Sequence, residues 1–203
     1  MTQGKPEWWS TFRTNDLFRP GPIVDLNACV GDNGGPYSFD DYAWGYIDAG
    51  HAIVRAAEER ETPVDVVVYP ATYCYRHGVE LWLKHLAVYL PPLWGEASQL
   101  RPTHKLSDNW EFVKQYFPRE NAFDPDGDAV PFLDKVIANL VDFDPSGEVF
   151  RFPEDRKGSL YLQDARIINL DVLRRVMTAT GEQFKHFGRI ADALYEVRAQ
   201  QGK

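Results

Sequence analysis

The residue types best suited to chemistry lie close together in one stretch of the sequence, between Tyr73 and Lys84. Arg76, Glu80 and Lys84 are four positions apart, so on an α-helix they form a polar stripe that also holds Tyr73 and His77, within an arc of roughly 100°. The residues around them are mostly apolar, which predicts a helix in the core. A charged stripe on such a helix must pair internally or face a cleft, because burying an unpaired charge is costly.

One chemistry that these residue types favour is metal-independent cleavage of RNA. It needs a cation to neutralise the phosphate and a base to take the 2′-hydroxyl proton. Arg76 with Arg151 could supply the cation, and His77 or His104 the base, if the loop that holds Arg151 folds over the helix.

The alternative interpretation of the same residues is structural. Arg76 with Glu80 and Glu80 with Lys84 can form ion pairs at helical spacing, either on a solvated face or inside a satisfied buried network. Arg151 can then pair with Glu80 or close a helix end. The two interpretations stay open at this level.

The elements that must position these residues are helices. Ser38-Phe39-Asp40-Asp41 is typical of a capping box, Thr62-Pro63 separates two helices, and Pro70 is expected to kink the second. The second helix has the most apolar sequence and is expected at the centre of the bundle. The sequence thus predicts an all-α fold, an antiparallel bundle of about five helices; the expected helices span about 38–61, 64–90, 105–117, 130–141 and 170–199.

The first 37 residues have a different character. They are rich in proline, glycine and aromatic residues and show no helical period, which predicts an extended aromatic N-terminal arm over 1–37 and a helical domain over 38–203. Trp8 and Trp9 are the expected anchors of this arm, and Ile23 to Leu26 is expected to form at most a short strand.

Composition excludes several classes of protein. Of the 203 residues, 44% are hydrophobic, which excludes a disordered chain. The net charge of −8 argues against sequence-blind binding to nucleic acid. No apolar run approaches the roughly 18 residues of a membrane span, and the first residues show no secretory pattern. Cys29 and Cys74 form neither a disulfide framework nor a zinc motif, so we expect a cytoplasmic protein without membrane contact.

Three stretches of the chain resemble bacterial HEPN-like proteins. The helix from Tyr75 to Lys84 is similar to the second helix of that family. Pro102 to Trp110 resembles its His-x-Leu…Trp helix start, and Phe150 to Gly158 resembles its Phe-Arg-Tyr-Pro loop before the last helix. The stretches occur in the family's order and cover roughly residues 38–185.

The resemblance implies an all-helical homodimer with one of two roles. The first is a metal-independent ribonuclease, or an RNA- or nucleotide-binding component, of a toxin–antitoxin or defence system, with a cognate protein partner. The second is a non-catalytic interaction module, favoured because the family's nucleases have roughly four to six residues between an arginine and a histidine, whereas Arg76 directly precedes His77. Neither role implies a metal or cofactor. The candidate catalytic residues are Arg76, His77, Glu80 and Arg151, and the candidate substrate-binding residues are Tyr73, Lys84, His104, Arg156 and Lys157.

Three other motifs resemble functional sites, but each is expected to have only a structural role. Asp124 to Asp128 has glycine at the wrong position for a calcium loop and is expected to be a solvated turn. Gly31 to Pro36 lacks the lysine of a phosphate-binding loop and is also expected to be a turn. Cys74 lies three positions before His77, yet no third group is evident, so a buried thiol is expected rather than a nucleophile.

Overall fold

The computed structural model describes residues 18–35, 37–100, 103–164 and 167–201. They divide into two units, one ending at Tyr37 and the other beginning at Ser38. In the described part of the first unit, the regular element is a 3-10 helix, η2 (Val24–Leu26), and not a strand. Every described side chain of this unit is exposed. Trp8 and Trp9 lie outside the described residues.

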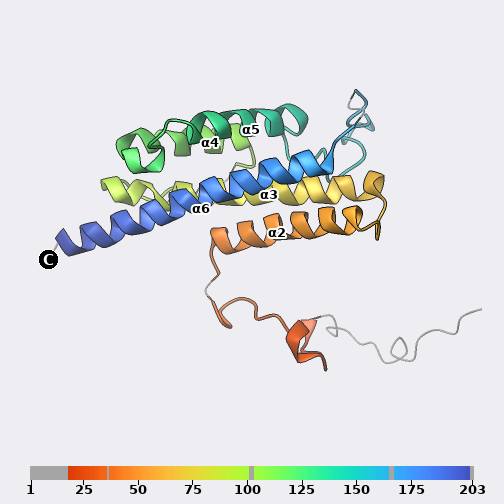
Figure 1. The fold of residues 1–203 in the computed structure, drawn as a ribbon, viewed down its shortest axis with the longest axis horizontal. Coiled ribbons are helices and arrows are strands. Elements are labelled where there is room, and N and C mark those ends of the chain that lie inside the picture. Colours follow the sequence, from red (N-terminus) through yellow and green to blue (C-terminus); the bar gives the residue numbers. More distant parts are fainter. Residues whose placement is uncertain (1–17, 36, 101–102, 165–166, 202–203) are drawn as a thin grey trace, which may run out of the picture. The chain divides into compact units, whose positions relative to one another are not determined.

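The second unit confirms the all-α bundle (Figure 1). Its helix α3 contacts α2, α4 and α6, so the predicted central position of this helix is also confirmed. Within the described ranges, the only β-type pairing is an isolated bridge between Glu154 and Leu160. No helix in those ranges has both the length and the apolar character needed to cross a bilayer. The helices are α2 (Phe39–Glu58), α3 (Val64–Tyr89), α4 (Leu106–Lys114), α5 (Ala129–Phe143) and α6 (Leu170–Gln201), with 3-10 turns η3 (Pro91–Trp94), η4 (Phe117–Arg119) and η5 (Asn121–Phe123) between them.

The helices α2 and α3 begin at the residues that the sequence pattern predicts. The backbone N–H of Ser38 donates to Asp41 Oδ2 at 2.7 Å, which completes the capping box of α2. Pro63 is the N-cap of α3, and this helix continues through Pro70 as one element. Pro70 has no N–H to donate to the carbonyl of Val66 one turn earlier. The first turns of α3 therefore have one fewer backbone hydrogen bond to the rest of the helix.

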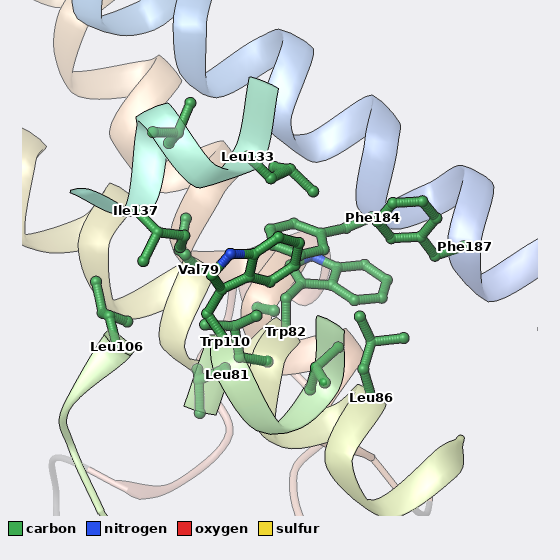
Figure 2. Packing of buried hydrophobic residues seen from close by; sticks show 14 of the residues in the cluster. Val79, Leu81, Trp82, Leu86, Leu106, Trp110, Leu133, Ile137, Phe184 and Phe187 are labelled. Carbon is green, nitrogen blue, oxygen red and sulfur yellow. The ribbon is translucent and has the colours of Figure 1, made fainter. Parts of the chain in front are cut away.

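The core is built around aromatic side chains from several helices. Figure 2 shows side chains of α3, α4, α5 and α6 meeting around Trp82 and Trp110. Trp82 stacks on Phe184 of α6, with ring centroids 5.7 Å apart and an interplanar angle of 8°. Phe187 lies one turn further along α6, with its ring centroid 4.3 Å from that of Phe117. The first contact holds α6 against the face of α3 opposite the polar stripe, and the second holds α6 against the 3-10 turn η4.

The crossing of α2 and α3 depends on a missing side chain at Gly78. A Cβ atom at this position would lie 2.7 Å from Cγ1 of Ile47 and 3.1 Å from the backbone oxygen of Ala43. We expect Gly78→Ala to lower the free energy of unfolding by about 1–3 kcal/mol, because the two helices must move apart. Urea denaturation would measure the change.

Gly45 on α2 provides the matched control. It is exposed, and no atom lies within 4 Å of the Cβ position. Gly45→Ala should raise the free energy of unfolding by about 0.5–1 kcal/mol, because alanine has the higher helix propensity. Equal effects of the two substitutions would contradict the described crossing.

Candidate functional site

Arg76 lies at the centre of a buried polar network and is 3% exposed. Its Nε donates to the backbone oxygen of Asp144 at 3.2 Å and lies 3.2 Å from the carboxylate Oδ2 of the same residue. Nη1 donates to Glu80 Oε2 at 3.2 Å, and Nη2 donates to the backbone oxygen of His104 at 3.3 Å. One guanidinium thus joins α3, the segment before α4 and the end of α5. We call Arg76, Glu80, Lys84, His104 and Asp144 the Arg76 network.

Glu80 is the second centre of this network and is 2% exposed. Its Oε1 accepts a hydrogen bond from Lys84 Nζ at 2.8 Å and lies 2.7 Å from His104 Nδ1. Burial alone would raise the pKa of Glu80, but the hydrogen bonds from Lys84 and His104 outweigh it, so the pKa is lowered. Glu80 is therefore an ionised carboxylate near neutral pH.

Asp144 belongs to the network and Gly147 lies directly against it, and neither was among the predicted site residues. Asp144 Oδ1 accepts the backbone N–H of Gly147 at 2.7 Å and that of Val149 at 3.2 Å. Gly147 has a φ of 82°, and a Cβ atom there would lie 2.8 Å from Arg76 Nη1. The helix-ending sequence Asp144-Pro145-Ser146-Gly147 signals a turn, but nothing in it indicates a contact with Arg76.

His77 belongs to a different group of side chains. It stacks on Tyr73 with centroids 5.6 Å apart and meets the ring of Tyr46 edge-on at 4.5 Å. The guanidinium of Arg151 lies 5.7 Å from the centroid of Tyr73 and 5.2 Å from that of Phe152. We call Tyr46, Tyr73, His77 and Arg151 the Tyr73 cluster. Within the described residues, no hydrogen bond or ion pair links His77 to the Arg76 network.

The burial of His77 makes its contribution to the free energy of unfolding depend on pH. It lowers the pKa of this histidine below the ordinary value of 6.5, with Glu80 acting in the opposite direction. The unfolded chain therefore binds a proton more readily, and stability is lost as the pH falls through about 6.5 towards the folded pKa. His77→Phe should reduce the loss of unfolding free energy between about pH 7.5 and about pH 5.5, as measured by urea denaturation. Identical losses in both proteins would show that His77 contributes nothing to it.

Arg156 and Lys157 lie apart from both groups. They occupy the tip of a hairpin-like loop in which the Asp155 carboxylate accepts the backbone N–H of Lys157 at 2.7 Å and that of Ser159 at 2.9 Å. These backbone hydrogen bonds lower the pKa of Asp155. Arg156 is exposed, and its nearest acidic partner is Glu148 at 3.9 Å. Of the nine predicted site residues, four thus join the Arg76 network, three join the Tyr73 cluster and two lie in this loop.

The remaining sequence motifs have local roles. The Asp124 carboxylate accepts the backbone N–H groups of Ala129 at 3.0 Å and Val130 at 3.1 Å, and so satisfies the start of α5. Burial raises the pKa of the Cys74 thiol, as expected for a thiol that is no nucleophile. No group of three or more His, Cys, Asp or Glu residues among those that the structure describes could hold a metal ion.

A groove lies beside the Tyr73 cluster, between the first turns of α3 and the chain before α6. Its volume is about 870 Å³, and Arg151 is part of its wall. Figure 1 shows the loop that forms this wall at the same end of the bundle as the start of α3. We call it the α3 groove; its lining residues are Val64, Asp65, Val68, Tyr69, Val149, Phe150, Arg151, Phe152, Pro153, Leu160, Tyr161, Leu162, Gln163, Ile167 and Ile168.

Comparison of the chain with protein-family models, with curated proteins and with solved structures finds no match.

Proposed function

We propose that this protein is a HEPN-like helical binding module without catalytic activity, which works in the cytoplasm as a homodimer. The burial of Arg76 and Glu80 carries the proposal, since the two side chains are 3% and 2% exposed. A phosphate group cannot reach a guanidinium whose Nε, Nη1 and Nη2 all donate to atoms of the protein itself. The charges of the network thus support structure rather than turnover.

In this proposal, the Arg76 network positions the loop that follows α5. Asp144 binds Arg76 on one side and two backbone N–H groups of the following loop on the other. That loop continues into Val149 to Pro153, which forms one wall of the α3 groove. The network therefore holds the loop in place beside α3 and keeps the groove formed.

An RNA cleavage assay in EDTA tests the proposal. We expect the full-length protein to leave total RNA uncut at high protein concentration. Products with 2′,3′-cyclic phosphate ends that disappear in His104→Ala would overturn it.

His104 favours a second candidate function, metal-independent RNA cleavage within a toxin–antitoxin or defence system. Its side chain is 71% exposed, while its Nδ1 lies 2.7 Å from the buried Glu80 carboxylate. A histidine oriented in this way through Nδ1 has Nε2 available to take a proton from a 2′-hydroxyl, with Lys84 as a nearby cation.

Two histidine variants distinguish cleavage by His104 from cleavage by a contaminating nuclease and from loss of cleavage through misfolding. If His104 is the base, His104→Ala should lower the cleavage rate by at least about 100-fold. His77→Ala is the matched control, because His77 belongs to the Tyr73 cluster and should retain cleavage. Equal loss in both variants would exclude His104 as the specific base.

A further inference from the structure

The α3 groove has the size and preformed wall of a small-molecule site. Its volume of about 870 Å³ falls within the range of roughly 300–1,000 Å³ that ligand pockets occupy. One wall is a hairpin-like loop held by its own hydrogen bonds, including Asp155 N–H to Ser159 O at 2.9 Å and Tyr161 N–H to Pro153 O at 3.0 Å. The groove therefore needs little ordering when a ligand enters.

The lining of the groove is apolar and accessible. Three of the lining residues are polar, and the others are aliphatic or aromatic. Leu160 and Ile167 are 59% and 90% exposed, and Tyr69 and Phe152 are also exposed. Contiguous apolar surface of this kind is typical of a binding site. It favours a ligand with an apolar body.

Leu162 adds an independent observation at the same place. Its φ is 55°, in the left-handed region that a leucine rarely adopts. Such strain persists only where the surrounding structure imposes it, and it concentrates at ligand sites. The strained residue is itself part of the groove lining.

Arg151 supplies the polar feature of the groove. Its guanidinium lies against the rings of Tyr73 and Phe152, and among the described residues no carboxylate lies within ion-pair distance of it. Arginine presents a planar fork of donors that matches a carboxylate. Asp65 lines the same groove and disfavours ligands with several negative charges, such as nucleotides.

We infer that the α3 groove binds an amphiphilic monocarboxylate, with its apolar chain along the groove and its carboxylate on Arg151. The inference rests on the proposed binding-module function and names the ligand class for it. It assigns Arg151 to ligand binding.

Decanoate is the probe for this site, measured by calorimetric titration into the full-length protein. We expect saturable binding below about 1 mM, and binding of decanol at least about tenfold weaker because the alcohol lacks the charge. Arg151→Gln should weaken decanoate binding by at least about tenfold and leave decanol unchanged. Lys157→Gln, which removes an exposed cation outside the groove, should change neither.

Two further variants test where the chain of the ligand lies. Leu160→Asp should abolish binding of decanoate and decanol, whereas Val197→Asp on α6, also at an exposed apolar residue, should not. The absence of saturable binding below 1 mM, or equal affinities of wild type and Arg151→Gln, would overturn the inference. So would loss of self-association in Leu160→Asp without decanoate binding to wild type, since the groove would then be an interface between copies. None of these outcomes depends on the RNA assay, so failure here and failure of the proposed function are distinguishable.

Discussion

Glu80→Ala is expected to lower the free energy of unfolding by about 3–5 kcal/mol, as measured by urea denaturation. The substitution leaves Lys84 Nζ without the carboxylate it contacts at 2.8 Å and Arg76 Nη1 without its partner at 3.2 Å. Both side chains are buried, so water cannot replace the lost hydrogen bonds. Glu80→Gln, which keeps the shape and removes the charge, should give a smaller loss.

Glu182→Ala is the matched control for this prediction. Glu182 also pairs with a lysine on its own helix, Lys185, at 2.9 Å, but the two side chains are 57% and 42% exposed. Its loss should cost less than about 0.5 kcal/mol, because exposed pairs contribute little. If Glu80→Ala were as mild as Glu182→Ala, the Arg76 network would not be structural, and the burial argument for the proposed function would fail with it.

Phe187→Ala is expected to have an effect of similar size, about 3–5 kcal/mol of unfolding free energy, from a different cause. Phe187 is fully buried and lies against Phe117 and Phe123, with ring centroids 4.3 and 6.1 Å away. Removing its ring leaves a cavity between α6 and the 3-10 turns that follow α4. Thermal and urea denaturation would both report the loss.

Phe143→Ala provides the comparison at an exposed position. Phe143 is the last residue of α5 and is 45% exposed, so the same substitution should cost less than about 1 kcal/mol. Equal losses at the two phenylalanines would contradict the packing of α6 described above.

The helices could be predicted closely because their limits are encoded locally. The second helix was expected over about 64–90 and spans Val64–Tyr89, since a proline precedes it and two prolines follow it. The third was expected to reach about residue 117 but ends at Lys114, because the chain then tightens into the 3-10 turn η4. The prediction that Ile23 to Leu26 forms at most a short strand was wrong, because a 3-10 turn of three residues is too short to show a periodic pattern in the sequence.

The candidate site could be predicted only where its contacts are local. Arg76, Glu80 and Lys84 share one helix face, so their spacing alone identifies the pairs. Asp144 is 68 positions from Arg76, and no pattern in the sequence connects them. His77 was grouped with Arg76 because both fall within the polar stripe of the helix. However, His77 is rotated by roughly 100° around the helix from Arg76, and its ring contacts Tyr46 and Tyr73 instead.

Pro70 divides α3 into two parts with different neighbours. The turns before it line the α3 groove through Val64, Asp65, Val68 and Tyr69, while the turns after it carry the Arg76 network and the core. Because the amide ladder is interrupted at this residue, the first turns can unwind locally at a lower free energy than global unfolding. In amide hydrogen exchange, the groove wall would then form its own cooperative unit, which a ligand in the groove would protect while the core amides kept their slow rates.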